Sequence, residues 1–310
     1  MVTAVAFEKL VLVTRKTRLQ ELVERLNSRG QAKFYIEHAG GDFSDYERED
    51  DAYRHALATL RKELNVGLKL HAVDRWLVPT CLFTKHDLIV TLGQDGLVAN
   101  VAKYVGEQPV VAVNPQPERF DGILLPFVAD QARAAVQRVL DGTATERRVT
   151  LAEVDLNDGQ TLTAFNDFYI GQKTHFSSRY KITLRGQSEA QSSSGVIVST
   201  GAGSTGWMSS VYHMAAGVST FAGGTPGRMP KLDWEDRRLL FAVREPFLSR
   251  HSKISIAAGL IESPRELVIE SLMPQNGVIF GDGVESDFIE FTSGKVARIR
   301  AAKRQARLVT

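Results

Sequence analysis

Cysteine is nearly absent from this sequence, which has 310 residues and a single thiol, Cys81. One thiol can form no intrachain disulfide and no cluster of thiolates around a metal ion. Such sparse use of cysteine is typical of a reducing compartment, and we expect a cytoplasmic protein. Long apolar runs are absent too. No window approaches about 18 consecutive apolar residues, so we predict no membrane-spanning helix and no membrane partner.

Neither sign of charge predominates, because the formal net charge is +2 and basic and acidic residues are interspersed. The nearest thing to a basic block is RIRAAKRQAR at 298–307, which we interpret as a solvated final strand or helix. The pattern therefore predicts no nucleic-acid partner. Near the other end, Glu8 and Lys9 interrupt an apolar stretch, and we expect a first buried strand there rather than a signal peptide.

Several catalytic motifs are missing as well. The seven histidines show no H-E-x-x-H spacing, and we expect no directly bound metal ion. A phosphate-binding P-loop needs a lysine after its second glycine, where the segment GAGSTGW has Trp207. A nucleophile elbow reads G-x-S-x-G, and around Ser204 its first glycine is replaced by Ala202.

What the sequence does have is the composition of a globular protein, with 43% hydrophobic and 24% charged residues. At this length two domains are the natural expectation. Through about residue 142 buried-type strands alternate with amphipathic helices, which predicts a mostly parallel sheet covered by helices. The expected strands are 9–14, 67–73, 87–93 and 109–114, and the expected helices lie at 18–28, 46–64, 95–105 and 130–140. We expect Gly30 to stop the first helix and the polar segment 39–50 to form a mobile loop.

After residue 142 the pattern changes to short strands with few helical windows, which is typical of a β-rich domain. The expected strands lie at 147–156, 162–171, 179–186, 195–200, 237–247, 253–259, 265–273, 277–283, 286–292 and 295–302. One helix is expected to begin near Ser204, and 215–230 is the clearest loop. We therefore predict an α/β N-terminal domain at 1–143 and a β-rich C-terminal domain at 144–310, whose last residues can pack back on the first domain.

The segment GVIVSTGAGSTGW at 195–207 contains G-x-G-x-x-G after a strand, the dinucleotide-binding fingerprint. That fingerprint normally opens a βαβ unit, with an acidic residue about 20 positions further on to hold the ribose. Here that position falls in FAGGTPG, and the next acidic residue is Asp233. The strand also belongs to the β-rich half. A conventional Rossmann interpretation is therefore disfavoured.

A second glycine motif lies in DLIVTLGQDGLVANVAKYV at 87–105, where a strand, a tight turn and a helix follow one another. Glycines let such a turn approach a phosphate chain, and its backbone N–H groups can form an anion-binding nest. The helix N-terminus adds its positive dipole end. Asp95 would lie at the carboxyl edge of a parallel strand, where α/β sheets bind ligands. The alternative is that Asp95 merely caps the helix.

Taken together, the motifs resemble the NAD kinase family. In that family a G-G-D-G-T turn in the first domain pairs with an N-E dipeptide and a T-P-T-G-S-T-A-Y-like loop in a β-rich second domain. The counterparts here are GQDGL at 93–97, Asn166-Asp167 and STGAGSTGW at 199–207, in the same order. The mitochondrial-type branch and its bacterial relatives are most similar, through VLVTRKTR (11–18), VAVNPQPERFDGILLPF (111–127), SSSGVIVSTGAGSTGW (192–207), FAVREPF (241–247) and FGDG (280–283).

The resemblance implies the two-domain NAD-kinase-like fold, related to that of phosphofructokinases, and a phosphoryl transfer from ATP to the 2′-hydroxyl of the adenosine ribose of NAD. Asp95 would be the catalytic residue, which accepts or orients the proton of that hydroxyl. Gly93, Gln94, Gly96 and Leu97 would hold the donor phosphates through backbone amides. Mg²⁺ would be held by phosphate oxygens and water, not by the protein directly.

The resemblance also implies a set of residues that bind NAD and a homodimeric assembly. Trp207 would stack on a ring of the nucleotide, or would instead be a core aromatic that opens a helix. Arg244 would lie near phosphate, or would form a surface ion pair. The full NAD-binding set is Asn114, Gly122, Asn166, Asp167, Ser204, Thr205, Gly206, Trp207 and Arg244.

The chain departs from the family pattern at several positions. Gln94 replaces a glycine of the turn, Leu97 replaces its threonine, and Asp167 shortens the family's glutamate. Ser194 stands where many members have an acid, a departure shared with the mitochondrial-type branch. Two alternatives stay open: a kinase of the same fold that acts on a sugar or lipid hydroxyl, and a catalytically weak nucleotide-binding relative. Whether the donor is ATP or polyphosphate, and the acceptor NAD or NADH, is also open.

Overall fold

The computed structural model describes residues 7–310, which divide into two compact units. Unit 1 runs to Arg147 and includes Arg307–Thr310, and unit 2 is Arg148–Ala306. Each unit has a hydrophobic core of its own. No helix in the described residues is both long and apolar enough to cross a membrane. The α/β and β-rich halves that the sequence predicts are confirmed as the two parts of the fold.

Unit 1 is built on a parallel sheet in the order β2-β1-β3-β4. The strands are β1 (Lys9–Thr14), β2 (Lys69–Asp74), β3 (Asp87–Leu92) and β4 (Pro109–Asn114). Along its free edge β4 also pairs in parallel with the short β5 (Phe127–Val128) and with Arg307 and Leu308 of the last strand. Every residue of β3 and β4 is buried, as expected for a sheet covered on both faces.

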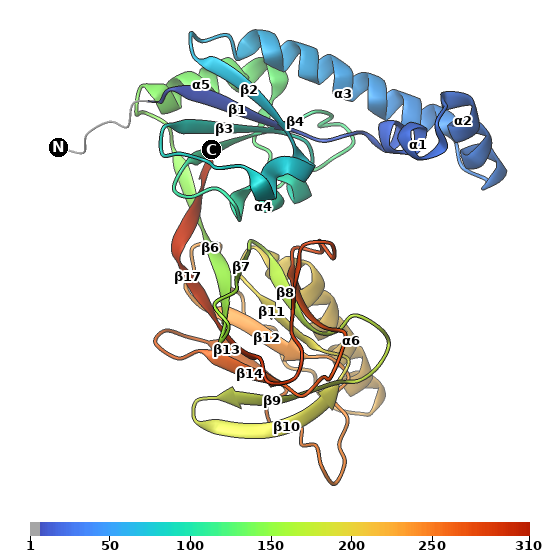
Figure 1. Cartoon of the computed structure of the whole chain (residues 1–310), viewed down its shortest axis with the longest axis vertical. Coiled ribbons are helices and arrows are strands. Elements are labelled where there is room, and N and C mark those ends of the chain that lie inside the picture. Colours follow the sequence, from blue (N-terminus) through green and yellow to red (C-terminus); the bar gives the residue numbers. More distant parts are fainter. Residues whose placement is uncertain (1–6) are drawn as a thin grey trace. The chain divides into compact units, whose positions relative to one another are not determined.

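The helices of unit 1 are α1 (Arg18–Leu26), α2 (Arg29–His38), α3 (Phe43–Glu63), α4 (Asp95–Ala102) and α5 (Ala132–Leu140). Short 3₁₀ turns lie at Arg75–Thr80 and Ala129–Gln131. Figure 1 shows α3 and α5 on one side of the sheet and α4 on the other. Buried residues of α3 and α5, such as Leu60 and Val136, pack there against Leu10, Leu12 and Val90 of the sheet.

Two sequence predictions in this half are wrong. Gly30 does not stop the first helix; Asn27 ends α1 in the left-handed conformation, and Gly30 lies inside α2, which Ser28 caps through its side chain. The segment 39–50 is not a mobile loop, because α3 begins within it at Phe43, after the N-cap Asp42. The polar surface of this segment is solvated helix rather than loop.

Unit 2 contains two antiparallel sheets. The first has the order β10-β9-β14-β17, and β6 joins it by pairing with β17 and with β7. Its strands are β6 (Glu146–Leu156), β7 (Thr161–Ala164), β9 (Ser178–Leu184), β10 (Gln187–Ser193), β14 (Leu267–Ser271) and β17 (Val296–Val309). The basic tail is therefore a strand, one of the two forms that the sequence left open.

The second sheet of unit 2 has the order β13-β12-β11-β8-β15-β16. Its strands are β8 (Asp167–Gln172), β11 (Val196–Ser199), β12 (Leu239–Val243), β13 (Ala258–Ile261), β15 (Gly277–Gly281) and β16 (Phe288–Glu290). Because side chains alternate along a strand, Val196 and Val198 of β11 face one way and Ile197 the other.

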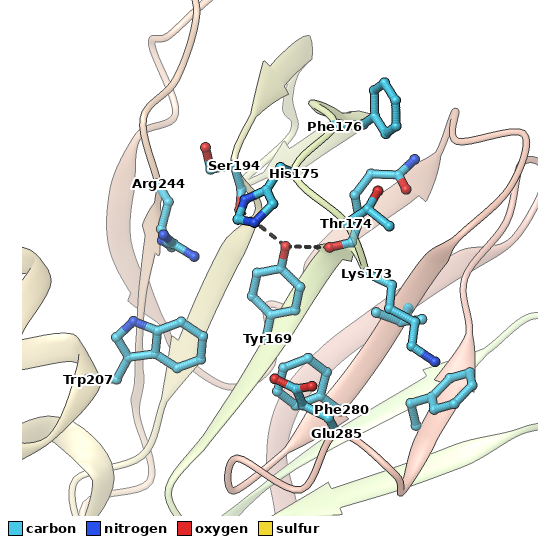
Figure 2. A pocket seen from close by; sticks show the side chains of 13 residues that line it. Tyr169, Lys173, Thr174, His175, Phe176, Ser194, Trp207, Arg244, Phe280 and Glu285 are labelled. Atoms are coloured by element: carbon cyan, nitrogen blue, oxygen red, sulfur yellow. Dashed lines mark hydrogen bonds between the residues drawn. The ribbon is translucent and has the colours of Figure 1, made fainter. Parts of the chain in front are cut away.

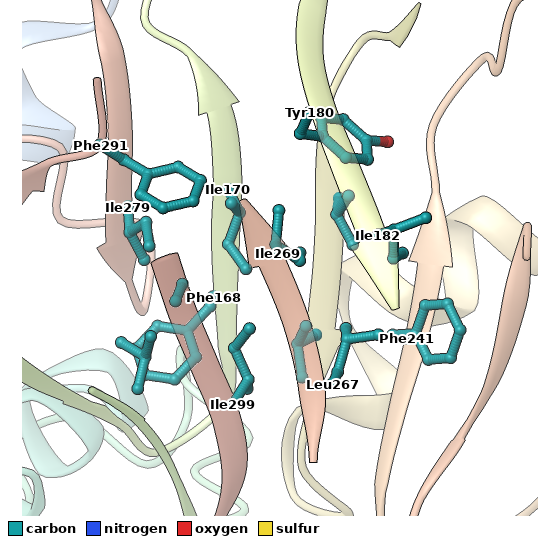
Figure 3. Packing of buried hydrophobic residues seen from close by; sticks show 14 of the residues in the cluster. Phe168, Ile170, Tyr180, Ile182, Phe241, Leu267, Ile269, Ile279, Phe291 and Ile299 are labelled. Atoms are coloured by element: carbon teal, nitrogen blue, oxygen red, sulfur yellow. The ribbon is translucent and has the colours of Figure 1, made fainter. Parts of the chain in front are cut away.

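The core of unit 2 lies between these two sheets (Figure 3). Phe168, Ile170 and Phe241 from the second sheet meet Ile182 and Ile269 from the first, and all five are fully buried. This packing of one sheet on another fixes the strands that carry the predicted nucleotide loop.

The remaining helix, α6 (Trp207–Phe221), covers the outer face of the second sheet. Met208 packs there with Ile197, Leu240 and Ala242. The predicted loop at 215–230 is wrong in its first part, because those residues complete α6. A 3₁₀ turn at Gly203–Thr205 leads into the helix, which therefore starts close to the predicted position.

We expect Phe241→Ala to lower the free energy of unfolding by about 3–5 kcal/mol, because it removes a fully buried ring between two sheets. Urea denaturation followed by circular dichroism measures this loss. Phe221→Ala is the matched control, since its ring is 94% exposed and its removal should change stability by less than about 0.5 kcal/mol. Equal losses in both variants would contradict the described core.

Candidate nucleotide-binding site

The predicted phosphate turn joins β3 to α4 in unit 1, as the motif requires. Gly93 donates its N–H to the carbonyl of Val113 at 3.2 Å. A Cβ on Gly93 would lie only 2.7 Å from Cδ2 of Leu97, so a side chain here would displace the Leu97 side chain. Gln94 is the N-cap residue in extended conformation, and its side chain makes no capping hydrogen bond. The turn is thus held by backbone contacts and by the packing of Leu97.

The amides of this turn differ in availability. Asp95 and Gly96 open α4, and the first N–H groups of a helix have no acceptor inside it. Gly96 is exposed and its Cβ position has no neighbour within 4 Å. Leu97, in contrast, donates its N–H to the carbonyl of Gln94 at 2.9 Å, and its side chain is 4% exposed. Leu97 therefore serves as a packing residue, and the prediction that its amide holds phosphate finds no support in this geometry.

Asp95 is half-buried, and its Oδ1 accepts a hydrogen bond of 2.6 Å from the backbone N–H of Leu124. This bond ties the carboxylate to the segment after β4 rather than to the amides of α4. In this structure the Asp95 side chain therefore does not cap α4, which was the alternative interpretation of this residue. A carboxylate fixed in this way at the carboxyl edge of a parallel sheet is oriented for a ligand.

Asn114 and Gly122 organise the segment that follows β4. The Asn114 side chain donates to the carbonyl of Phe120 at 3.0 Å and accepts from the N–H of Gln116 at 3.0 Å. Gly122 has a positive φ of 63°, and a Cβ there would lie 2.7 Å from Nδ2 of Asn114. Both residues shape the segment that holds Asp95; direct contact of either with NAD remains a prediction.

In unit 2 the Asn166-Asp167 pair lies directly against the glycine loop. Thr200 donates its N–H to the carbonyl of Asn166 at 2.9 Å, and its hydroxyl donates to the carbonyl of Phe165 at 2.7 Å. A Cβ on Gly203 would collide with the carbonyl of Asn166. The third residue of the G-x-G pattern is therefore glycine because two backbones meet there, and not because of Rossmann geometry.

The late D-G turn completes this arrangement. Asp282 accepts hydrogen bonds from the backbone N–H groups of Phe165 at 3.1 Å and Asn166 at 2.6 Å. Its own N–H donates to the carbonyl of Asp167 at 3.0 Å. We call this arrangement, in which Asp282 hydrogen-bonds to Asn166-Asp167 and Gly203 packs against the carbonyl of Asn166, the acceptor clasp. It joins three motifs that are distant in the sequence.

Asp167 is 8% exposed within the clasp. Burial, together with the nearby charge of Asp282, raises the pKa of Asp167 from 3.8 to about 7. A group of this kind can gain or lose a proton near neutral pH, which is a property common at functional sites.

The other predicted residues of the loop differ in exposure. Ser204 is buried and donates its hydroxyl to the carbonyl of Gly201 at 2.7 Å, so it stabilises the loop from inside. Thr205 and Gly206 are exposed, and Trp207 is half-buried at the start of α6. Thr205, Gly206 and Trp207 are therefore the members of this segment that a ligand can reach.

Trp207 and Arg244 line a cavity of about 420 Å³ in unit 2 (Figure 2). The Trp207 ring stacks on Tyr169 at a centroid distance of 5.9 Å, and the Arg244 guanidinium lies 5.6 Å from the centroid of Trp207. Tyr169 also contacts Phe280 at 5.1 Å. Both predicted residues thus line one pocket. Trp207 also opens α6 and packs against the cluster of Met208, and Arg244 forms an ion pair with Glu245 at 3.7 Å, so the alternative interpretations of these two residues stay open.

Sequence reasoning missed most of the residues that line this pocket. They include Tyr169, Lys173, Ser194, Phe280 and Glu285. Tyr169 lies in β8 and Lys173 directly follows it. Because β8 starts at the predicted residue Asp167, the sequence could have indicated that other residues of this strand line the site. The cavity combines flat aromatic walls with cationic side chains, a lining suited to the ring and phosphate of a nucleotide.

Within residues 7–310 there is no group of three or more His, Cys, Asp or Glu side chains arranged to hold a metal ion.

Comparison with known proteins places this fold. No protein-family model matches the chain. Yeast NADH kinase, solved with NADH, superposes with a TM-score of 0.58 at 17% identity and covers 98% of this chain and 84% of its own. An NAD kinase from Archaeoglobus fulgidus, solved with ATP, superposes with a TM-score of 0.56 at 14% identity, and the match covers 97% of this chain and 93% of that kinase. The chain therefore has the two-domain fold of these NAD and NADH kinase structures.

Sequence comparison points to the same family. The NAD kinase of Chlorobium phaeobacteroides (strain BS1) is 30% identical over 141 residues, which are 43% of this chain and 46% of the relative. That of Chlorobium limicola (strain DSM 245 / NBRC 103803 / 6330) is 31% identical over 139 residues, or 42% and 45%. The matched region spans less than half the length of these curated relatives. The resemblance to the NAD kinase family is confirmed by fold and partial sequence; similarity to the mitochondrial-type branch stays a prediction.

The raised pKa of Asp167 predicts a pH-dependent cost in stability. Between pH about 4 and about 7 the folded chain retains a proton that the unfolded chain has released, so this group's contribution falls as pH rises. We expect Asp167→Asn to lack this loss. Between pH 4 and pH 7.5 the free energy of unfolding of this variant should therefore rise relative to that of the original chain, by at most about 4 kcal/mol. Urea denaturation at a series of pH values measures the difference, and a difference independent of pH would refute the prediction.

Proposed function

We propose that this chain is an NAD kinase, which transfers the terminal phosphoryl group of ATP to the 2′-hydroxyl of the adenosine ribose of NAD. The observation that carries the proposal is the acceptor clasp, in which Asp282 and Gly203 fix the Asn166-Asp167 pair. The pocket of Trp207 and Arg244 on the same sheet supports it, because a dinucleotide presents both a flat ring and phosphate.

Asn166 and Asp167 would bind the adenosine ribose, and Thr205, Gly206 and Trp207 would contact the adjoining parts of the dinucleotide. Ser204 would act through the loop that it stabilises, since its hydroxyl is already engaged with Gly201. Asp167, with a pKa near 7, can accept a hydrogen bond from a ribose hydroxyl when ionised and can donate one when protonated.

Asp95 would orient the 2′-hydroxyl and accept its proton as the phosphoryl group arrives. Such a step depends mainly on positioning and on stabilisation of charge, and a fixed carboxylate contributes to the first. The hydrogen bond from Leu124 holds this carboxylate in one place. The amides of Asp95 and Gly96 at the start of α4 would bind donor phosphates.

Mg²⁺, bound through phosphate oxygens and water, would supply neutralising charge to the donor. The resemblance also leads us to expect a homodimer in the cytoplasm, which light scattering and cell fractionation test.

Two alternatives make different predictions about the product. A sugar or lipid kinase of this fold would phosphorylate another alcohol, whereas a weak nucleotide-binding relative would bind ATP without turnover. The replacement of a threonine hydroxyl by Leu97 is the observation that favours the second, although Leu97 is accounted for by its packing against Gly93.

Asp95→Asn should reduce formation of NADP from NAD and Mg-ATP by about 10²- to 10⁴-fold, because it removes the base and keeps the shape. An enzymatic cycling assay for NADP measures the rate. Asp130→Asn is the control, since Asp130 is an exposed acid at another helix start in unit 1. A rate for Asp95→Asn within threefold of the unchanged chain would remove Asp95 from the mechanism.

Arg244→Gln should raise KM for NAD by about tenfold with little change in KM for ATP, because it removes a cation beside Trp207 from the acceptor pocket. Steady-state kinetics with each substrate varied in turn measures both constants. Arg185→Gln serves as control, since Arg185 is an exposed arginine of unit 2 that pairs with Glu262 and does not line this pocket. An equal rise in both constants would argue against a role specific to the acceptor.

A further inference from the structure

The parallel sheet of unit 1 has a switch point between β1 and β3. These strands are neighbours, but the chain leaves β1 toward β2 on one side and leaves β3 toward β4 on the other. At such a point a crevice opens outside the carboxyl ends of the two strands, and open α/β sheets bind ligands there. The residues that leave the two strands are Arg15, directly after β1, and Gly93, directly after β3.

Unpartnered polar atoms gather at this same edge. Among the residues that the structure describes, buried side-chain atoms without a hydrogen-bond partner are Arg15 Nε, Thr91 Oγ1, Gln116 Oε1 and Gln108 Oε1. The first three lie at or just beyond the carboxyl ends of β1, β3 and β4, and only Gln108 lies at the opposite end, before β4. Buried polar groups are nearly always paired, so these three atoms are open to partners from outside the chain, such as water or a ligand.

Arg15 lies against the phosphate turn. Its side chain is 10% exposed, and a Cβ placed on Gly93 would be 3.6 Å from Arg15 Cδ. The guanidinium is held by the carbonyl of Lys16 at 3.0 Å and by Oε1 of Glu49 at 3.1 Å, while Nε has no partner. A positively charged fork therefore lies within a side chain's length of the turn with part of its hydrogen-bonding capacity unused.

Glu49 does not depend on Arg15 alone. Its other oxygen, Oε2, accepts a hydrogen bond of 2.6 Å from Nε of Arg18, a residue whose side chain is 42% exposed. If the Arg15 guanidinium turned toward the sheet edge, Glu49 would keep one arginine, and a buried unpaired carboxylate would be avoided. The cost of freeing Arg15 is lowered by this second ion pair.

We propose that Arg15 is a binding residue for the polyphosphate of the phosphoryl donor. In the free chain it rests on Glu49, and it turns to the phosphates when they enter the turn of Gly93 to Gly96, leaving Glu49 to Arg18. The inference rests on the proposed function for the identity of the donor, and it adds a cationic side chain to a site otherwise made of backbone amides. Guanidinium groups suit this role because they bind phosphate through two parallel hydrogen bonds.

Titration calorimetry of the full chain with inorganic tripolyphosphate tests the proposal without requiring turnover. Arg15→Gln should weaken binding by about tenfold or more, because a charged hydrogen-bonding group is lost, and Arg15→Lys should recover part of it. Glu49→Gln should bind tripolyphosphate at least as tightly as the unchanged chain, since it releases Arg15. Arg48→Gln is the matched control, because the Arg48 side chain forms its ion pairs with Asp42 and Asp45 and not with the Glu49 carboxylate.

The outcomes separate the inference from the function beneath it. Weaker binding in Arg15→Gln alone, together with a raised KM for ATP and an unchanged KM for NAD, supports the proposal. Unchanged binding in Arg15→Gln overturns it even if NADP is formed, and so does an equal loss in Arg15→Gln, Glu49→Gln and Arg48→Gln, which would indicate a structural role. A tripolyphosphate affinity that depends on Arg15 in a chain that makes no NADP supports the inference and overturns the proposed function. Absence of tripolyphosphate binding overturns the inference.

Discussion

The acceptor half of the proposed site depends on a close approach of two backbones. The glycine loop touches the carbonyl of Asn166 at a point where Gly203 leaves no space for a side chain. The carboxylate of Asp282 accepts a hydrogen bond from the backbone N–H of the same residue, Asn166. Because a larger residue at 203 would separate the strands, this contact determines where Asp167 and Trp207 can lie. Gly203 is thus required for packing, whether or not a ligand binds.

The two units contribute different chemistry. Unit 1 offers backbone amides, a fixed carboxylate at Asp95 and a cation at Arg15, all at the carboxyl edge of a parallel sheet. Unit 2 offers an aromatic pocket and a carboxyl group, Asp167, whose pKa lies near neutrality. The proposed transfer between two nucleotides would require both kinds of chemistry: an anion site for the donor, and a surface for ring and ribose recognition for the acceptor.

The departures from the family turn have a physical reading in this fold. Leu97 is buried and fills the space beside Gly93, so the residue that replaces a threonine contributes packing where the family has a hydroxyl. Gln94 takes the N-cap position without making a capping bond. The side-chain contribution to phosphate binding is then absent from the turn itself, and Arg15 on the neighbouring strand end is positioned to supply it.

Sequence reasoning predicted the elements whose signal is local. The buried runs of β1, β3 and β4 and the periodicity of α5 are apolar patterns that neighbouring residues specify. It missed β10, whose polar residues become a strand only because they pair with β9, and where Gln191 is buried against Tyr180. It also missed α2, because Gly30 looked like a stop and the true end of α1 is a left-handed Asn27.

The candidate site divides in the same way. The turn around Asp95 and the loop before Trp207 were visible as motifs, since each lies within a short stretch of chain. The pocket was not, because Tyr169, Phe280 and Arg244 belong to different strands or their ends and meet only through the pairing of β8 with β15 and of β11 with β12. The partner of Asp95 in the segment after β4 was hidden for the same reason.

The most direct test of the central claim is to identify the product. The purified chain is incubated with Mg-ATP and NAD, and the phosphorylated product is examined by ³¹P nuclear magnetic resonance. The account predicts a new monoester phosphate on the 2′-hydroxyl of the adenosine ribose, formed in equal amount with ADP. ADP formation with the phosphate on another alcohol, or tight binding of both nucleotides with no transfer, would contradict it.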